Sequence, residues 1–599
     1  MVKRLIIAEK KEQAQGYAKA LGRAKKSGDT FFATDSLHIA YCAGHLFGIT
    51  NDARVSYKSR ENLPLYPELE DYTFDYSETQ DASLTRLKKQ LFKNLKKEIA
   101  WCDEIIIGTD GDREGESIFY TMIDKIPGAR QKIKYRLWVG TSTKAGIQKA
   151  YANLQDPEAT YGHYLAADAR RKADWLIGVA NLTPYVRHRL RELGKLSSSK
   201  VKGKEVPEKI SVGRILLPIM KLIIDREREI KAHQPKKFWK LELIDQFGTI
   251  FTSSLIFGGE ENEKTKAEAQ VAFEALETEA VVSSVLQKDE VKSAPHLFNL
   301  TNLQKYMSDK HGIDSEKTQK TAEGLRLREG GADGYLSYPR TDSLYITEDE
   351  FLYLKANLKA LKALIGLKFE PENLEPRRRY VDETKTNPHY ALIPTETLPD
   401  LDTLSHLEKK VYQEVAKRTL LMFAGDKKEA KTEVDLSLAS CGASFKATGT
   451  QVLEEGWSAL EGQKTKDKQL PPYHEGQVLQ LSKKLKEGLT KAPPSHTEKT
   501  LLNRMNKLSI GTSSTRAAAI NRLKKEKYLL VNKKGEFEST EKARKIIELL
   551  ENQGSKFVDL EMTKNWEIML KLIEQGNKDF TPENFIAQVQ EELSRTLKG

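Results

Sequence analysis

Cysteine and long apolar runs are scarce in this sequence, and both absences narrow the class of protein. Only three cysteines occur in 599 residues, Cys42, Cys102 and Cys441, and no two form a CxxC pair. Neither a disulfide framework nor a cysteine zinc site is therefore expected. No apolar run approaches the ~20 residues of a membrane span, and the start MVKRLIIAEKKEQA becomes charged too early for a secretory signal. We expect a large soluble protein of the cytoplasm that has no membrane partner.

The charge balance favours a polyanionic partner. The net charge is +11 and the sequence pI is about 9.0, which suits nucleic acid or an acidic membrane surface. A length of 599 residues predicts roughly three to five structural units. Internal repeats and long low-complexity segments are absent from the sequence.

The first 150 residues alternate short apolar runs with polar helical stretches, which is typical of an α/β unit with a parallel sheet. One run, residues 5–8, ends in Glu9-Lys10, and another, residues 105–108, ends in TDGDREGE. Functional groups gather at the carboxyl ends of strands in such sheets. The two acidic ends are therefore expected to share one site.

The rest of the chain predicts helical units around an interrupted β-rich unit. Residues 166–230 have a helical pattern, whereas FWKLELID and KTEVDLSLAS alternate with period two. The two β segments are interpreted as two visits to one unit, and the helical insert between them carries SYPRTDS, residues 337–343. The last hundred residues are expected to be helical, and residues 464–527 are strongly basic.

Asp110, Asp112 and Glu114 occupy alternate positions, so an extended segment would project their carboxylates to one side. Hard oxygen ligands of this kind suit Mg²⁺. The alternative is a solvated acidic loop with Arg113 as its counter-ion. The position directly after an apolar strand favours the metal site.

Tyr338 is either a packed aromatic or a phenol held out to react. Pro339 follows it and favours an extended conformation. A phenol of pKa ~10 needs a cation or a base before it can attack. Arg340, two residues on, can supply that charge and bind the oxyanions of a phosphoryl transition state. The combination predicts phosphoryl transfer.

Other candidates have equally plausible structural interpretations. Glu9 and Lys10 could act as an acid-base group and a phosphate-binding cation, or form a surface ion pair. His389, in NPHYALIPTE, could bind phosphate or be structural. Arg214, in SVGRILLP, is a groove-lining or a surface cation. The stretch GTSSTR, residues 511–516, is a possible phosphate cradle.

Taken in order, these motifs resemble the type IA DNA topoisomerases. SYPRTDS resembles their active-site tyrosine motif, and AEK with TDGDREGE resembles the two acidic motifs of their Toprim domain. Further similar segments follow in family order: RRKADWLIG, SVGR with Pro218, FNLTNLQ, PHYALIPT, TEKTLLNRM and IGTSSTRAAAI. The resemblance covers nearly the whole chain, and it is strongest to bacterial topoisomerase III because zinc modules are missing.

The resemblance implies a role for each matching residue. Tyr338 would form a 5′-phosphotyrosine with single-stranded or underwound DNA, Arg340 would stabilise the transition state, and Glu9 would be the general acid and base. Lys10 and His389 would contact the phosphate. Asp110, Asp112 and Glu114 would hold Mg²⁺. DNA would be bound by Arg170, Arg171, Arg214, Arg516, Thr512 and Ser343.

The implied fold is multidomain, α/β plus α+β, and forms a torus with an N-terminal, Rossmann-like Toprim domain. The expected domains are a Toprim domain (1–155), a helical DNA-binding domain (156–215 and 490–599), a β-rich arch (216–285 and 405–489) and a helical lifting domain (286–404). ATP is not expected as a cofactor, since no GxxxxGK[ST] loop occurs, and zinc is not expected, since no CxxC pair occurs. A monomer is expected in the cytoplasm at the bacterial nucleoid, with a RecQ-like helicase or a single-strand-binding protein as partner.

The sequence departs from the family at several positions. After Gly-Arg the family usually has an apolar residue and then Gln with Ser or Thr before proline. Leu216 and Leu217 stand at the positions of the Gln and the Ser or Thr, which puts base contacts in the DNA groove in doubt. Lys11 and Glu12 replace a common Pro-Ser. Residues 247–292 are too few for the long loop that some topoisomerases III use in decatenation.

Two other functions remain open. A Toprim-type nuclease or primase would use the same acids and metal without needing Tyr338. A non-catalytic clamp would bind single-stranded DNA with strong salt dependence and form no covalent adduct.

Overall fold

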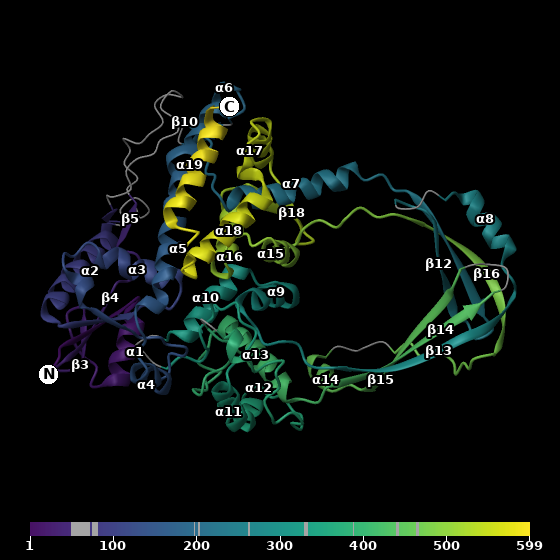
Figure 1. The fold of residues 1–599 in the computed structure, drawn as a ribbon, viewed down its shortest axis with the longest axis horizontal. Coiled ribbons are helices and arrows are strands. Elements are labelled where there is room, and N and C mark those ends of the chain that lie inside the picture. Colours follow the sequence, from purple (N-terminus) through teal and green to yellow (C-terminus); the bar gives the residue numbers. More distant parts are fainter. Residues whose placement is uncertain are drawn as a thin grey trace.

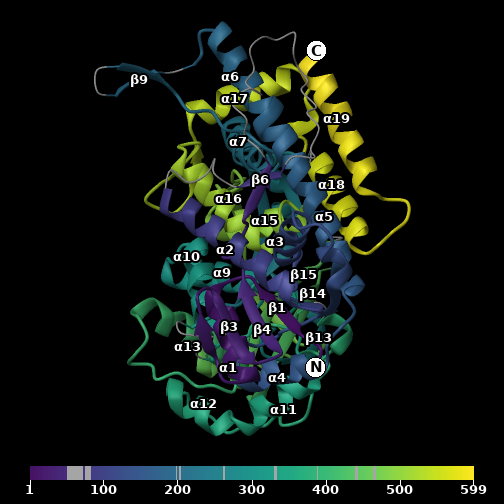
Figure 2. The same ribbon diagram turned by 90° about the vertical axis from the view of Figure 1, so that its left-hand side faces the viewer.

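The computed structural model describes residues 1–49, 72–74, 82–196, 198–201, 204–260, 264–328, 333–386, 389–438, 443–462 and 467–598. Four units are arranged as a ring (Figure 1). Strands of the N-terminal unit lie between helices α11 (Glu348–Ala356) and α12 (Leu358–Ile365) below and the C-terminal helices α17 (Glu541–Asn552) and α19 (Pro582–Lys598) above (Figure 2). Within these described ranges no helix is both long and apolar enough to cross a membrane.

The N-terminal unit is built on a mixed six-stranded sheet of order β2-β3-β4-β1-β7-β8. β4, β1, β7 and β8 run parallel, and β2 and β3 are antiparallel additions at one edge. Apolar residues such as Leu5, Ile6 and Ile107 are fully buried in the sheet, because helices cover it. Its strands are β1 (Arg4–Ala8), β2 (Lys25–Ser27), β3 (Thr30–Thr34), β4 (Leu37–Tyr41), β7 (Glu104–Gly108) and β8 (Ile133–Arg136), with a separate pair β5 (Phe47–Ile49) and β6 (Tyr72–Phe74). Its helices are α1 (Lys11–Leu21), α2 (Ala82–Trp101), α3 (Arg113–Ile123) and α4 (Lys144–Ala152), with a 3₁₀ turn at Ala129–Lys132.

A second, helical unit combines the middle and the end of the chain around one hydrophobic core. α5 continues into a π-helical segment, Trp175–Leu182, before α6 begins. The middle part comprises α5 (Glu158–Asp174), α6 (Thr183–Glu192), a hairpin of β9 (Ser198–Val201) and β10 (Lys204–Pro207), and α7 (Leu216–Ala232). The end comprises α15 (Glu498–Lys507), α16 (Ser513–Lys525), β17 (Leu529–Val531), β18 (Phe537–Ser539), α17 (Glu541–Asn552), a 3₁₀ turn at Lys556–Val558, α18 (Leu560–Glu574) and α19 (Pro582–Lys598).

A closed antiparallel barrel of order β11-β12-β15-β14-β13-β16 forms the far end of the ring (Figure 1). Inward side chains such as Leu241, Leu243 and Val434 are buried, and α8 packs on the barrel. The strands are β11 (Lys237–Asp245), β12 (Ile250–Gly258), β13 (Glu279–Lys292), β14 (Lys427–Ser437), β15 (Phe445–Glu454) and β16 (Val478–Leu489), with α8 (Lys266–Ala275) and the short α14 (Trp457–Glu461).

The insert between β13 and β14 is helical and carries Tyr338 in a loop between two of its helices. Leu336 makes a bridge with Pro394, and Ser337 donates from its N–H to the carbonyl of Ile393 at 3.0 Å. The helices are α9 (Leu300–His311), α10 (Ser315–Arg326), α11 (Glu348–Ala356), α12 (Leu358–Ile365) and α13 (His406–Leu420), with 3₁₀ turns at Glu383–Lys385 and Leu421–Phe423. We call this segment the lifting unit.

Three expected boundaries differ from the observed elements. α7 starts at Leu216 but packs in the core of the helical unit, so the β-rich unit begins near residue 237 and not at 216. β13 extends to Lys292, beyond the expected end at 285. α13 packs inside the lifting unit through residues such as Val411 and Val415, so that unit continues past 404. The apolar faces of α7 and α13 select their units, whereas the extension of β13 follows its pairing with β14.

Cys42 and Cys102 are buried free thiols. Cys441 and the last two residues of KTEVDLSLAS lie outside the described residues.

Candidate active site

The two acidic strand ends meet at one edge of the N-terminal sheet. β1 and β7 are parallel neighbours with Ala8 opposite Gly108, so the chain leaves both strands on the same side. Gln13 joins the two exits: its side-chain oxygen accepts from the N–H of Glu9 at 2.8 Å, and its amide donates to Asp110 at 3.0 Å. Glu9 and Asp110 therefore belong to one site.

The segment Asp110–Glu114 is not extended, contrary to the alternating prediction. Asp112 is the N-cap of α3 and accepts from the N–H of Gly115 at 2.8 Å, so Glu114 lies in the first helical turn. Asp is a preferred N-cap, and a helix N-terminus attracts negative charge. Gly115 is required here, since a Cβ would lie 2.1 Å from the carbonyl oxygen of Asp110. The acids consequently point toward different partners.

Glu114 is held at the rim of the site by two basic groups. His45 Nε2 lies 2.8 Å from its carboxylate and Arg170 lies 3.5 Å from it. Burial alone would raise the pKa of Glu114, but His45 and Arg170 lower it to about 2. Glu114 is therefore a carboxylate at neutral pH.

Tyr338 reaches the acidic loop from the lifting unit. Its hydroxyl donates to Asp112 Oδ2 at 2.5 Å, and its ring lies 4.1 Å, centroid to centroid, from that of His389. The side chain is 1% exposed. Burial, with Asp112 and Asp110, raises its pKa well above the usual range. Tyr338 is thus a packed aromatic and also a phenol directed at a carboxylate.

Arg340 supplies positive charge beside that phenol. Its Nε donates to Glu323 at 2.7 Å, and its Nη1 lies 3.8 Å from Asp112 Oδ2. Despite burial, Tyr338 and Glu323 raise the pKa of this guanidinium. Glu323, which the sequence patterns did not identify, fixes the direction in which the cation points.

Arg326, at the last position of α10, is a second cation that no motif identified. It donates to both oxygens of Asp110, at 3.1 and 2.8 Å, and its guanidinium lies 4.4 Å from the ring centroid of Tyr338. Burial would raise the pKa of Asp110, but Arg326 holds it below its usual range. The only sequence signal would have been a basic residue at the end of the helix before SYPRTDS.

His389 is a neutral imidazole in this site. Burial, reinforced by Arg326, lowers its pKa to about 3. Neither ring nitrogen has a hydrogen-bond partner among the described residues. The ring lies between Tyr338 and Trp138, whose centroid is 5.3 Å away. Both nitrogens are therefore available to a ligand that enters the site.

Glu9 is a buried carboxyl that changes charge near neutral pH. Its Oε1 lies 3.4 Å from Lys10 Nζ, and its Oε2 is buried without a hydrogen-bond partner within the described chain. Burial, with the charges of Asp110 and Asp112, raises its pKa to about 7. A group with this pKa can both give and take a proton at neutral pH.

The acidic residues fit a hard divalent cation by their chemistry. Carboxylate oxygens are the ligands Mg²⁺ prefers, and Glu9, whose Oε2 has no hydrogen-bond partner within the described chain, is joined to Asp110 through Gln13. However, among the residues the structure describes, no three His, Cys, Asp or Glu side chains are grouped closely enough to hold a metal ion. Asp110, Asp112 and Glu114 are instead bound by Arg326, Tyr338 and His45.

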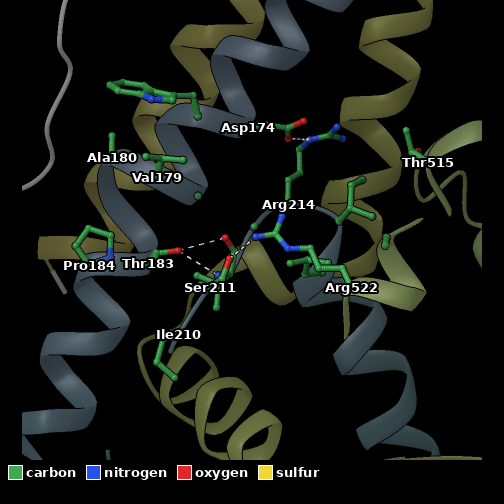
Figure 3. A pocket seen from close by; sticks show the side chains of 18 of the residues that line it. Asp174, Val179, Ala180, Thr183, Pro184, Ile210, Ser211, Arg214, Thr515 and Arg522 are labelled. Carbon is green, nitrogen blue, oxygen red and sulfur yellow. Dashed lines mark hydrogen bonds and ion pairs between the residues drawn. The ribbon is translucent and has the colours of Figure 1, made fainter. Parts of the chain in front are cut away.

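A cavity of about 1050 Å³ lies in the helical unit (Figure 3), and Arg170 of its lining lies 3.5 Å from Glu114 of this site. The π-helical segment and α6 form one wall of the cavity (Figure 3). The side chain of Arg214 projects toward Asp174, the last residue of α5 (Figure 3). Positive charge dominates the lining: Arg170, Arg187, Arg191, Lys209, Arg214 and Arg522 outnumber Asp174 and Glu567. Such a basic groove suits a nucleic acid backbone.

Ion pairs connect the cavity with the acidic loop. Arg214 is buried and donates to Asp174 at 3.0 Å and to Glu567 at 2.5 Å. Glu567 also lies 3.8 Å from Arg113 of α3. Arg170 lines the cavity and faces Glu114. A strand in the cavity would therefore approach the acidic site.

The predicted DNA-binding residues separate into two groups. Arg170, Arg214 and Thr512 line the cavity. Over the described chain the lining includes neither Arg171, which donates to Asp168, nor Arg516, which donates to the carbonyls of Ile510 and Gly511. Ser343 donates to the carbonyl of Lys385 in the lifting unit.

The two leucines that depart from the family pattern, Leu216 and Leu217, have different surroundings. Leu216 lines the cavity, but Leu217 is fully buried in the core of the helical unit. The expectation that both positions line the groove is wrong for Leu217, because successive positions on a helix face different directions.

Comparison with known proteins agrees with this architecture. Residues 158–583 match the family described as DNA topoisomerase, and residues 4–139 match the Toprim domain. DNA topoisomerase 1 of Pyrococcus horikoshii is 27% identical, over 99% of this chain and 84% of that protein. DNA topoisomerase 3 of Staphylococcus haemolyticus is 27% identical, over 100% of this chain and 82% of that protein.

The fold has a solved counterpart. Full-length topoisomerase I of Thermotoga maritima superposes with a TM-score of 0.71 at 21% identity, covering 99% of this chain and 90% of that one. The chain belongs to the type IA DNA topoisomerase family. It is therefore an isomerase that acts on DNA, and its predicted fold class, with an N-terminal Toprim domain, is confirmed.

Proposed function

We propose that Tyr338 cleaves single-stranded DNA by attacking a backbone phosphate and that the same site reseals it after strand passage. The observation that carries this proposal is the 2.5 Å hydrogen bond from the Tyr338 hydroxyl to Asp112, with Arg340 beside it. The covalent bond between Tyr338 and the DNA phosphate would retain the energy of the broken bond, so no ATP is needed. The result is relaxation of negative supercoils, decatenation, or both.

The proposed cleavage forms one bond to phosphorus and breaks another. The phenol oxygen of Tyr338 bonds to phosphorus, giving a 5′-phosphotyrosine, and its proton passes toward Asp112. The bond from phosphorus to the 3′-oxygen breaks, and the leaving oxygen takes a proton from Glu9. Resealing reverses both transfers, with Glu9 as the base. A Glu9 pKa of about 7 suits both directions.

Nearby polar groups act on the phosphate. Arg340 stabilises the charge that develops on its oxygens, and Lys10, half-exposed at the start of α1, contacts it. His389 can donate to the phosphate from a neutral ring, since its nitrogens have no hydrogen-bond partner among the described residues. Each of these residues can play its role without a change in the helix, strand or loop that carries it.

Asp110, Asp112 and Glu114 are the residues that would hold Mg²⁺. Bound there, the ion would neutralise phosphate charge and hold the cleaved end for resealing. The chain's own contribution is an oxygen-rich edge formed by the ends of β1 and β7. Zinc has no role in this proposal.

The cavity is proposed as the path of the bound strand. Arg170, Arg214 and Thr512 would contact its backbone, and Leu216 would face it. Arg171, Arg516 and Ser343 would reach DNA only after a rearrangement of their present hydrogen bonds. We further propose a monomer that works at the bacterial nucleoid with a RecQ-like helicase or a single-strand-binding protein.

The test uses a single-stranded oligonucleotide labelled at either end and stopped with detergent. Wild type is expected to form a covalent adduct that keeps only the 3′-end label, because the tyrosine holds the 5′-phosphate. Tyr338→Phe is expected to abolish it. Tyr335→Phe is the matched control in the same segment and is expected to retain the adduct.

The other candidate functions predict different results. Cleavage that persists in Tyr338→Phe would support a Toprim-type nuclease, and strand binding without any adduct would support a non-catalytic clamp. Either result contradicts the proposed chemistry.

A further inference from the structure

Arg326 binds both oxygens of Asp110, one of the three carboxylates of the proposed metal site. Asp110 Oδ1 accepts from Arg326 and Gln13, and Oδ2 accepts from Arg326. Arg326 is 3% exposed and Asp110 is 5% exposed. A bidentate guanidinium already neutralises this carboxylate. A divalent cation would have to compete for the same lone pairs.

Arg326 and Tyr338 are held together within the lifting unit. The N–H of Tyr335 donates to the carbonyl of Leu325 at 2.8 Å, and a Cβ on Gly334 would lie 2.0 Å from the carbonyl oxygen of Arg326. The Arg326 guanidinium also lies against the ring of Tyr338. A motion of the lifting unit as a body that withdraws Tyr338 from Asp112 therefore also withdraws Arg326 from Asp110.

The partners of these two residues lie together in the other unit. Asp110 and Asp112 follow β7 of the N-terminal sheet, two residues apart. The two interactions across the interface thus form and break as one. Once Arg326 leaves, the Asp110 carboxylate has lost its bidentate cation and its oxygens are open to another.

We propose that Arg326 is a positioning residue that substitutes for the divalent cation at Asp110 while the two units are closed, and exposes Asp110 to that cation when they separate. The inference rests on the proposed function, because it takes Asp110 as a metal ligand. In this proposal one arginine couples the separation of the two units to the affinity of Asp110 for the divalent cation. Arg326 acts through Asp110 and does not itself react.

The experiment measures Mn²⁺ binding to the full chain without DNA, by the loss of the free-ion electron paramagnetic resonance signal. Arg326→Gln is expected to bind Mn²⁺ roughly 10- to 100-fold more tightly than wild type, the range by which groups around metal ligands change affinity. Arg326→Lys is expected to be intermediate, because an ammonium group cannot bind both oxygens in the same way. It also provides a variant that keeps the charge if Arg326→Gln does not fold.

Arg328→Gln is the matched control. Arg328 lies two residues on and pairs with Glu408 at 2.7 Å, away from the acids. It is expected to bind Mn²⁺ as wild type does. Asp110→Asn is expected to remove the gain when combined with Arg326→Gln.

The outcomes separate the two proposals. If Arg326→Gln and Arg326→Lys bind Mn²⁺ no more tightly than wild type while Asp110→Asn weakens binding, the inference is overturned and the metal assignment stands. If Asp110→Asn leaves the Mn²⁺ affinity of Arg326→Gln unchanged, the ion binds elsewhere and the inference is overturned with that assignment. The oligonucleotide adduct, which reports Tyr338, is judged independently of both results.

Discussion

At the scale of single residues, Glu9 links protonation to stability. Burial and two acidic neighbours raise its pKa from 4.5 to about 7 in the folded protein. The folded state therefore binds this proton more tightly than the unfolded chain, so the stabilisation is complete below about pH 4.5 and is lost as the pH rises through about 7. The loss amounts to about 3 kcal/mol at ~1.4 kcal/mol per pKa unit.

Glu9→Gln should remove this dependence, because glutamine stays neutral. We expect the melting temperature of the variant, relative to wild type, to be several degrees higher at pH 8 than at pH 5. Thermal unfolding followed by circular dichroism at the two pH values measures it. A difference that does not change with pH would show that Glu9 is not buried as a titrating group.

The sequence predicted the residues that lie within motifs and missed those that packing supplies. Tyr338, Arg340, Glu9 and Asp112 lie in short ordered motifs, and the structure brings them together. The contact of Arg326 with Asp110 joins positions 216 apart and forms only when the lifting unit folds back onto the N-terminal sheet. No local pattern carries that information.

At the scale of elements, the start of α3 depends on a glycine. A Cβ on Gly115 would lie 2.1 Å from the Asp110 carbonyl oxygen, a contact with backbone that cannot rotate away. Gly115→Ala gains helix propensity, but we expect the displaced loop to cost about 1–3 kcal/mol. Chemical unfolding should show the loss, and the DNA adduct should decrease because Asp110 and Asp112 move.

Gly324→Ala is the control for this substitution. Gly324 lies within α10, and a Cβ there would have no heavy atom within 4 Å. We expect it to be neutral or to stabilise by about 0.5–1 kcal/mol. Equal effects of the two substitutions would mean that the close approach at Gly115 does not constrain the loop.

Element types were easier to predict than their partners. The apolar runs of β1 and β7 and the period-two strands β11 and β14 are strands in the structure. The acidic segment was wrongly expected to be extended, since alternate charges also suit an N-cap and a first helical turn. α7 was assigned to the wrong unit because its periodicity shows that it has an apolar face and not which core receives that face.

At the scale of the whole molecule, the ring is closed where the lifting unit meets the N-terminal unit (Figure 1). The described hydrogen bonds and ion pairs across this interface include Tyr338 with Asp112 and Arg326 with Asp110 inside, and Lys149 with Asp349 at the surface. The groups that make these contacts can form hydrogen bonds with water once the two units separate. The interface can therefore open while each unit keeps its own hydrophobic core.

Tethering this interface should separate cleavage from strand passage. Lys149 of α4 and Asp349 of α11 lie 2.5 Å apart with side chains 65% and 68% exposed, so replacing the pair costs little. We expect Lys149→Cys with Asp349→Cys, joined by a short cleavable crosslinker, to lose plasmid relaxation yet retain the oligonucleotide adduct. Reduction of the crosslinker should restore relaxation, and each single cysteine variant should be unaffected. Full relaxation by the tethered enzyme would mean that DNA passes without separation of these two units.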